Sequence, residues 1–491
     1  MCAPLQPGAG AADGRYNEVP WTLNGAVLSV RAEKAYVEAL NWLFGRADFE
    51  GRQPRMPEAF CLEPIRHLLG RLGDPHRRYA VVHIAGTKGK GSTAAMTAAI
   101  LQAAGYHTGL YTSPHLHTMR ERIQVDGRPI PLEAVVDLLD RLRPAVEADP
   151  ALTVFDILTA MGFLYFAESG VEVAVVEVGL GGRLDSTNVV EPSVCLITAL
   201  SLDHTEILGP TLAHIAFEKA GIMKPGVPAV TAPQPEEAMA VLRQVAAERD
   251  VPLFSLEGWR MGPQVITATG QQGEIVAPDG TRWSVRLPLL GRHQWENAAL
   301  AVAAARLLRA QGWALSDAAL REGLERVRWP GRFEVLRVEP PLVLDGAHNE
   351  ASAARLAETL AEVFPGRRWH LVFGASRDKP VERILAPLRP LIAAVWFTRS
   401  RHPRAADPDR LGPCRRSPGP LWASRGGGGH RSGPGPEGRC PGPGHRFPLR
   451  GRRGPRGVGR LERMAGARGR PRRDPGGRAL RRGREPGSVL A

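Results

Sequence analysis

Blocks of apolar and polar positions alternate along the middle of the chain. Runs of Val, Ile and Leu with the length of a strand are separated by longer stretches with helical spacing. Strands of this kind are typical of a parallel sheet that is buried on both faces. The predicted strands are 79–84, 107–113, 171–179 and 193–200, and the predicted helices are 94–106, about 131–148, and 153–169. This order predicts an α/β domain with helices on both faces of its sheet.

A second, shorter set of the same kind begins near residue 293. Its predicted helices are 297–312 and 350–364, and its predicted strands are 342–348, 368–375 and 391–397. Shorter β pieces that complete the first domain are expected at 226–232, 265–269 and 281–289. The predicted boundaries are a disordered tail at 1–15, a large domain at 16–292, a smaller Rossmann-like α/β domain at 293–410 and a second tail at 411–491.

Length and composition fit this organisation. The chain has 491 residues, 43% of them hydrophobic, which is more than one core usually organises. The N-terminus carries neither a basic leader nor an apolar segment, and no stretch reaches the roughly 18 apolar residues of a membrane span. None of the five cysteines lies in a C-x-x-C pair, which argues against a zinc site. We expect a cytoplasmic protein with no membrane partner.

The net charge of +14 comes from the C-terminal 80 residues. Residues 412–491 contain 20 Arg, no Lys and four acidic residues, so they carry +16 and leave −2 for the rest of the chain. They also contain 21 Gly and 12 Pro, and they lack any helical or alternating apolar period. Such a segment cannot bury a core. The folded part of the chain therefore has no basic bias.

Two explanations of this segment compete. One is a disordered basic tail that binds nucleic acid through phosphate contacts. The other, which we favour, is that the end of a GC-rich gene is read out of frame, because ordinary strand and loop sequence changes abruptly into Arg, Gly and Pro after about residue 410. Translation of the following nucleotides in the other two frames tests this, since amphipathic strands and a helix should then emerge in one of them.

The stretch "AGTKGKGST" at 85–93 lies between a predicted strand and a predicted helix. Gly86, Gly89 and Gly91 permit backbone amides to turn toward an anion, and the helix start adds partial positive charge. Lys90 is then placed to contact terminal phosphates. The general P-loop string is not met, because Ile84 stands at its first glycine position. On these residues alone, a tight turn without a ligand stays an alternative.

Seven further segments settle the resemblance. They are "YTSPHL" at 111–116, "VEVGLGGRLDSTNV" at 176–189, "LDHTEILG" at 202–209, "EKAGIMKPG" at 218–226, and the later "HQWENAA", "PGRFE" and "LDGAHN". Together with the glycine-rich loop, this ordered set resembles folylpolyglutamate synthases and dihydrofolate synthases of the Mur ligase superfamily over about 79–402. The resemblance implies a P-loop-type ATPase domain with a parallel sheet, followed by the smaller Rossmann-like domain.

The resemblance also implies the nucleotide and metal sites. Mg²⁺ would be bound by Ser113, Glu177 and His204, although a turn serine and a structural histidine are the commoner roles of such residues taken singly. Lys219 matches a lysine that the family converts to a carbamate, which would hold a second Mg²⁺. Lys90, Lys219 and His204 are the expected catalytic residues. The residues expected to contact ATP are Gly86, Thr87, Lys88, Gly89, Lys90, Gly91, Ser92, Asn297, Arg332 and Asp345.

By the same resemblance, the acceptor pocket involves two segments. Phe155 and Asp156 belong to the first, and Arg183, Leu184, Asp185 and Ser186 follow the "GLGG" turn in the second. Phe155 is available to pack against an aromatic pterin ring, although a core phenylalanine is the commoner role.

Three features depart from the family pattern. Lys88 stands where the family usually has Asn, Pro64 lies in an otherwise helical pattern that it should kink or shorten, and the Arg-Gly-Pro segment replaces the family's last helix and strands. The second sheet is then expected to lack its terminal strands and to expose an unpaired edge.

The function predicted from the whole is a monomeric ATP-dependent ligase. It would add L-glutamate to dihydropteroate or a tetrahydrofolate through an acyl phosphate, with closure of the two domains assembling the site. One alternative is another Mur-type amide ligase with a nucleotide-linked acid as substrate. The alternative from a different class is a nucleic-acid-binding protein that uses the Arg-rich tail, whose binding should weaken steeply with salt.

Overall fold

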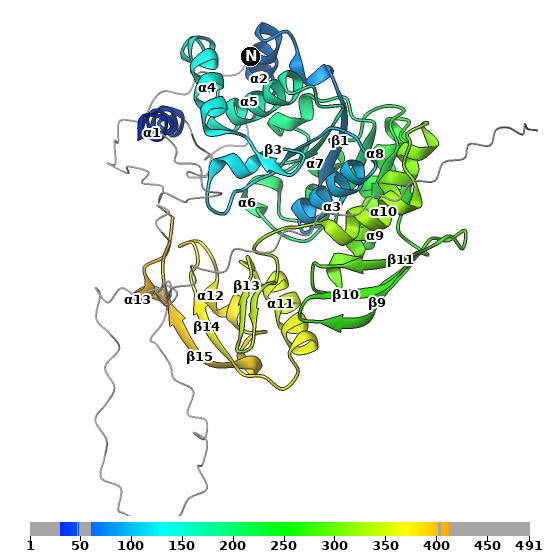
Figure 1. The fold of residues 1–491 in the computed structure, drawn as a ribbon. Coiled ribbons are helices and arrows are strands. Elements are labelled where there is room, and N and C mark those ends of the chain that lie inside the picture. The colour runs from blue at the N-terminus through cyan, green and yellow to red at the C-terminus, as the bar shows by residue number, and fades with distance from the viewer. Residues whose placement is uncertain (1–29, 47, 49–59, 401–403, 412–491) are drawn as a thin grey trace, which may run out of the picture. The chain divides into compact units, whose positions relative to one another are not determined.

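A computed structural model describes residues 30–46, 48, 60–400 and 404–411 (Figure 1). The tails predicted at 1–15 and 411–491 lie outside these residues, except for Leu411. The large domain is built on an eight-stranded sheet with the order β4-β3-β2-β5-β1-β6-β7-β8. Its strands are β1 (Ala80–Ala85), β2 (Thr108–Tyr111), β3 (Ile123–Val125), β4 (Arg128–Pro129), β5 (Val173–Glu177), β6 (Val194–Ile197), β7 (Ala229–Thr231) and β8 (Leu253–Ser255).

The predicted parallel sheet is confirmed for six strands, and an antiparallel hairpin that was not predicted extends one edge. Strands β2, β5, β1, β6, β7 and β8 pair in parallel, whereas β3 pairs antiparallel with both β2 and β4. The β3–β4 hairpin turns at Asp126 and Gly127, whose φ angles of +49° and +71° are those of a tight two-residue hairpin turn. The Asp-Gly pair was a readable signal for this hairpin. The strands on either side of it have only three and two residues, so they carry little alternation.

Successive side chains of the central strand β1 point to opposite faces of the sheet, and a separate set of helices covers each face. Val82 and Ile84 of β1 share a core with α3 (Lys90–Ala103), α9 (His293–Ala310) and α10 (Asp317–Arg326). Val81, on the opposite face, lies in a core with α1 (Val30–Phe44), α2 (Glu63–Arg71), α4 (Leu132–Glu147) and α5 (Val154–Glu168). Further along that face, Ala85 packs with α7 (Leu212–Ala220) and α8 (Glu236–Glu248). The core of the large sheet therefore includes helices beyond residue 292.

A three-stranded antiparallel sheet follows the large one in the chain. It has the order β11-β10-β9, from β9 (Arg260–Thr267), β10 (Gly270–Val276) and β11 (Arg282–Leu287). Trp283 and Leu287 of β11 are buried with Trp295 of α9 in the same core as α3. Pro64 does not kink α2, because the helix begins at Glu63 and the proline stands in its first turn, where no intrahelical donor is needed.

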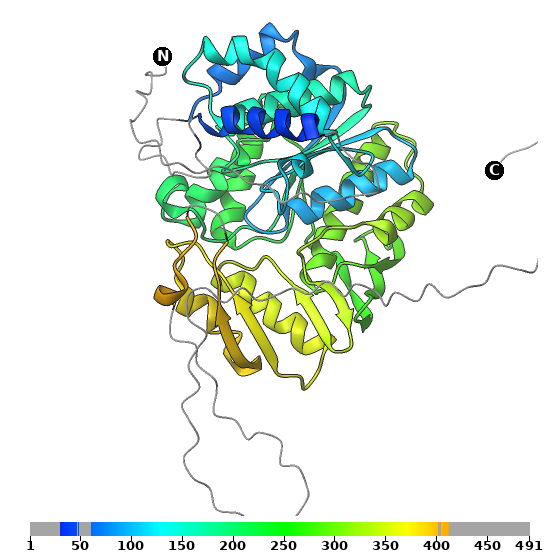
Figure 2. The same cartoon turned by 60° about the vertical axis from the view of Figure 1, so that its left-hand side comes forward.

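The C-terminal α/β region, drawn in yellow to orange in Figures 1 and 2, has a hydrophobic core against which Ile266 and Ala268 also pack. Its elements are β12 (Glu334–Val338), β13 (Pro341–Leu344), α11 (Glu350–Val363), β14 (Trp369–Phe373), α12 (Val381–Leu385), β15 (Ile392–Phe397) and α13 (Pro408–Leu411). Within the described residues its strands form two separate pairs, antiparallel β12–β13 and parallel β14–β15. Leu336 and Val372 are 53% and 69% exposed. The expectation that this sheet lacks its terminal strands stays a prediction.

A search of the described residues for membrane-spanning helices finds none that is long and apolar enough.

Candidate active site

The glycine-rich loop leads from β1 directly into α3. Gly89 is the N-cap of α3 and has a φ of +93°, and Lys90 is the first helical residue. The backbone N–H groups of Thr87 and Lys88 both donate to Ala199 O, at 3.1 Å. Since these two amides are engaged by the segment after β6, the donors free to face an anion are those of the first turn of α3. This is the strand–loop–helix arrangement that the sequence predicted.

Each loop glycine is approached so closely that a side chain would collide with a neighbour. A Cβ on Gly86 would lie 1.8 Å from Thr198 Oγ1, and one on Gly89 would lie 2.2 Å from Asn297 Oδ1. A Cβ on Gly91 would lie 2.9 Å from the Trp329 ring. The loop is therefore held between β6, α9 and the segment that precedes β12. This contact brings Asn297, a predicted ATP residue, beside the loop, and Asn297 lies inside α9 rather than capping it.

Ser113 and Glu177, two of the predicted metal ligands, lie together. The Ser113 amide donates to Glu177 Oε2 at 3.2 Å, and Glu177 is only 4% exposed at the end of β5. Burial raises the pKa of Glu177, while Lys90 and the Ser113 amide oppose the shift. A buried carboxylate with one amide donor has oxygen lone pairs left for a cation.

Lys219 is buried against the phosphate loop. Its Nζ donates to Gly86 O at 2.9 Å, and the residue is 4% exposed near the end of α7. Burial is the main cause that lowers the pKa of Lys219 to about 7, and the charge of Lys90 adds to it. An amine of this kind is largely neutral above pH 7, and it is therefore nucleophilic.

His204 lies at the start of the short helix α6 (Thr205–Leu208) in a left-handed conformation, with a φ of +51°. Its side chain is 45% exposed, and its Nε2 lies 3.9 Å from Asp203 Oδ1. Burial lowers the pKa of His204, which Asp203 opposes, and Lys379, Lys219 and Lys90 lower it further. A non-glycine residue held in this strained region is a common feature of functional sites. Because Lys90 and Lys219 both act on its pKa, His204 lies within electrostatic reach of both predicted catalytic lysines.

The described part of the chain contains no cluster of three or more His, Cys, Asp or Glu side chains placed to hold a metal ion. The predicted set contains only two such residues, Glu177 and His204, with the hydroxyl of Ser113 as a third ligand. Mg²⁺ commonly keeps several waters and takes few protein oxygens. The buried, incompletely paired Glu177 carboxylate fits such an ion.

The predicted acceptor residues gather around the loop 183–186. Arg183 donates through Nε and Nη2 to Glu218 Oε1, at 3.1 and 2.7 Å, beside Lys219. Asp185 accepts from the Leu180 and Thr187 amides, and burial raises its pKa. Leu184 is partly exposed on the same loop. Phe155 lies against the "GLGG" turn that precedes this loop, because a Cβ on Gly179 would be 2.5 Å from its ring.

The Asp156 carboxylate accepts three hydrogen bonds from the protein. Oδ2 accepts from Thr153 N at 2.9 Å and from Thr153 Oγ1 at 2.7 Å, which caps α5, and Oδ1 accepts from Ser186 Oγ at 2.6 Å. The residue therefore ties α5 to the loop of the predicted acceptor pocket, and its role in substrate binding stays a prediction.

Replacement of Asp156 by alanine should destabilise the fold by roughly 1–3 kcal/mol, because it leaves the Thr153 and Ser186 donors without their partner. Urea unfolding of wild type, Asp156→Ala and Asp156→Asn measures this, and the asparagine variant should lose less because it keeps one acceptor. An unchanged midpoint of unfolding in Asp156→Ala, together with a raised KM for the pterin substrate that the resemblance implies, would instead identify Asp156 as a ligand contact.

Arg332 and Asp345 lie together in the C-terminal region. Asp345 accepts from Phe333 N at 2.8 Å and from Ala347 N at 2.7 Å, so it also forms the strand-end turn. Arg332 Nη1 would lie 2.4 Å from a Cβ on Gly346. The charge of Arg332 lowers the pKa of both Asp345 and Glu177 against the effect of burial. Arg332, a predicted ATP residue of the C-terminal region, thus lies within electrostatic reach of Glu177, a predicted metal ligand of the large domain.

Sequence reasoning missed several residues at this site. Trp329 packs on Gly91, Thr198 lies under Gly86, and Asp203 pairs with Lys88. Asp203 stands inside "LDHTEILG", a segment already singled out, and Trp329 directly precedes the recognised "PGRFE". Lys379 belonged to no recognised motif, and only the fold brings it near His204.

Comparison with known proteins agrees with this geometry. Residues 84–305 match the Mur ligase middle domain, and residues 331–413 match the Mur ligase glutamate ligase domain. The dihydrofolate synthase/folylpolyglutamate synthase of Bacillus subtilis is 41% identical over 380 residues, which cover 76% of this chain and 87% of that protein.

Two solved structures are also similar. One is the Mycobacterium tuberculosis folylpolyglutamate synthase complexed with ADP and AMPPCP, with 37% identity, a TM-score of 0.69, and coverage of 77% of this chain and 85% of the other. The other is an FPGS–AMPPCP–folate complex, with 33% identity, a TM-score of 0.68, and coverage of 74% and 88%.

Proposed function

The chain belongs to the folylpolyglutamate synthase and dihydrofolate synthase family of Mur ligases, and on this premise we propose that it joins L-glutamate to the carboxylate of dihydropteroate or of a reduced folate. ATP is converted to ADP and phosphate in the reaction. The observation that carries the proposal is the convergence of Lys219, Asn297 and the first turn of α3 on one glycine-rich loop. Structures of relatives with ADP, AMPPCP and folate support these ligands.

The chain's own residues would act first on the nucleotide. Backbone amides in the first turn of α3, from Lys90 to Ser92, would hold the terminal phosphates, and the Lys90 ammonium would neutralise their charge. Gly86, Thr87 and Gly89 give the loop its conformation. Asn297 would contact ATP from α9, and Arg332 and Asp345 would contact it from the C-terminal region. Arg332 suits a phosphate because its planar fork donates two parallel hydrogen bonds.

Transfer then proceeds in two steps. The acceptor carboxylate attacks the γ-phosphorus, the bond to the β–γ bridging oxygen breaks, and an acyl phosphate and ADP form. The amine of glutamate next attacks the acyl carbon, the bond to the phosphate oxygen breaks, and the amine releases a proton. Alignment of the reacting groups and stabilisation of their charge are the main contributions that a protein can make here.

The proposal includes two Mg²⁺ sites. Ser113, Glu177 and His204 would hold one ion, and Lys219, once converted to a carbamate, would hold another. Bound Mg²⁺ would neutralise phosphate charge and keep the reacting oxygens in line. Phe155, Asp156 and the loop from Arg183 to Ser186 would form the pterin pocket. The monomeric state stays a sequence-based prediction, as does the cytoplasmic location, since the human relative is named mitochondrial.

The test is direct addition of glutamate. The full chain is incubated with ATP, Mg²⁺, L-glutamate and either dihydropteroate or tetrahydrofolate, and the pterin product is examined by mass spectrometry. The mass should rise by one glutamyl residue, with ADP formed only when both acceptor and glutamate are present. No mass change with either acceptor would contradict the proposal, and salt-sensitive nucleic-acid binding in the same preparation would favour the role of the basic tail.

A further inference from the structure

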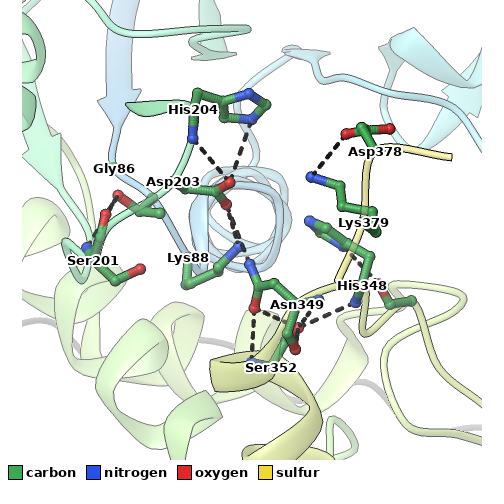
Figure 3. Close-up of polar contacts among 12 residues, drawn as sticks. Gly86, Lys88, Ser201, Asp203, His204, His348, Asn349, Ser352, Asp378 and Lys379 are labelled. Atoms are coloured by element: carbon green, nitrogen blue, oxygen red, sulfur yellow. Dashed lines mark hydrogen bonds and ion pairs between the residues drawn. The ribbon is translucent and has the colours of Figure 1, made fainter. Parts of the chain in front are cut away.

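The Asp203 carboxylate joins three segments of the chain. On Oδ2 it accepts from Lys88 Nζ at 2.7 Å and from Asn349 Nδ2 at 3.2 Å, and on Oδ1 it accepts from the His204 amide at 3.1 Å (Figure 3). Its side chain is 14% exposed and that of Lys88 is 27% exposed. A charged hydrogen bond that is largely shielded from water is worth more than an exposed surface pair.

Asn349 is fixed in orientation by the helix that it caps. Its Oδ1 accepts from the Ser352 amide at 3.0 Å and from Ser352 Oγ at 2.8 Å, which closes the first turn of α11. The amide nitrogen is consequently turned outward and meets Asp203. One side chain thus links the start of α11 to the segment that follows β6.

Lys88 is placed to pair with Asp203. Its backbone amide is anchored on Ala199 O at 3.1 Å, and its side chain reaches the carboxylate of Asp203. The other charged groups that act on Lys88 are Lys90 and Lys379, which repel it. The ion pair depends on the charge of the Lys88 side chain, which an uncharged residue at this position would not supply.

We propose that Lys88 is a positioning residue that acts through Asp203: the pair holds the start of α11 against the phosphate loop, and thereby sets the C-terminal region for the reaction. Lys88 Nζ and Asn349 Nδ2 donate to the same oxygen of Asp203, Oδ2, so Lys88 holds in place the atom to which Asn349 binds. The consequence for catalysis rests on the proposed ligase function, whereas the contact itself does not depend on it.

Hydrogen–deuterium exchange of the free full chain tests the contact without any substrate. Asp203→Ala and Lys88→Met should raise the exchange rate of peptides that contain the Ser352 and Ala353 amides by about tenfold, the effect of losing one charged hydrogen bond. Lys88→Arg should restore slow exchange and Lys88→Asn should not. Lys34→Met removes a lysine from an exposed ion pair with Glu38, and it should leave these peptides unchanged.

The kinetic arm uses the same variants in the glutamyl-addition assay. Lys88→Met should lower kcat about tenfold and change the affinity for AMPPCP less than twofold, because Lys88 acts on domain placement. Unchanged exchange in α11 of Lys88→Met would overturn the proposal. A large loss of AMPPCP affinity with kcat preserved would also overturn it, because that result would identify Lys88 as a phosphate contact. If wild type shows no glutamyl addition, the proposed function fails while the exchange result still decides the contact.

Discussion

Replacement of Lys219 by methionine is expected to lower kcat by roughly 10³-fold, the scale seen when a group that stabilises transition-state charge is removed. Methionine fills similar volume, so the loss would reflect chemistry and not a cavity. The Lys219 amine is buried, lies 2.9 Å from Gly86 O and has a pKa of about 7. In the proposed carbamate formation, the neutral amine would attack carbon dioxide above this pH, forming an N–C bond as one C–O π bond breaks and a proton leaves to solvent. The proposed carbamate would be an anion suited to Mg²⁺.

Lys224→Met is the matched control. Lys224 also donates to a backbone carbonyl, Asn188 O at 3.0 Å, and burial also lowers its pKa. This variant should retain kcat within a few-fold. Wild type should also lose activity when bicarbonate is removed, with recovery on its return, and Lys219→Met should not respond. Activity in Lys219→Met equal to that in Lys224→Met would contradict the role proposed for this lysine.

The pH dependence of stability separates catalysis from unfolding. The pKa of Lys219 is lowered from 10.5 to about 7 in the fold, so between these values the unfolded chain binds more protons than the folded one. The free energy of unfolding of wild type relative to Lys219→Met should therefore rise as the pH increases from about 7 to 10.5. Below pH 7 the methionine variant should be the more stable one, because it buries no charge. Thermal or urea unfolding across this range measures the effect.

Gly89→Ala is expected to weaken ATP binding on the order of 10²-fold, as a displacement of about 1 Å at a reacting site can do. The new Cβ would lie 2.2 Å from Asn297 Oδ1, so the loop must move away from α9. The φ of +93° adds backbone strain for any residue with a side chain. Isothermal titration with AMPPCP measures the change.

Gly105→Ala separates strain from collision. Gly105 has nearly the same φ, +92°, but a Cβ there would meet nothing within 4 Å. It should lose about 1–2 kcal/mol of stability from backbone strain and keep its affinity for AMPPCP. Equal affinities in the two variants would contradict the account of the loop.

Much of the fold was predictable because the local signals were strong. Near-continuous apolar strands such as β1 and β5 have few alternatives to a buried parallel sheet, and the glycine-rich turn between β1 and α3 could be located from "AGTKGKGST". The two-residue strand β4 carried too little pattern. Helices α9 and α10 could be recognised as helices, but their packing beside α3 is a tertiary contact without a local signature.

The candidate site could also be predicted from the sequence only in part. Motif resemblance found Lys219, Glu177 and Asn297, and the structure brings these to the loop or its neighbourhood. It did not show that Asp156 has a structural role, in which its carboxylate accepts hydrogen bonds from Thr153 and Ser186. A helix-capping residue and a ligand-binding residue cannot be told apart in a single sequence. The pairing of Lys88 with Asp203 was also beyond reach, because 115 positions separate the two residues and only the order of β1 and β6 in the sheet unites them.

The most direct test of the proposed chemistry follows one oxygen atom. The acceptor is labelled with ¹⁸O in its carboxylate, and the phosphate released during glutamyl addition is examined by mass spectrometry. Transfer through an acyl phosphate predicts one ¹⁸O atom in each phosphate released, because the carboxylate oxygen that attacked phosphorus leaves with it. Unlabelled phosphate formed together with the glutamylated product would contradict this mechanism.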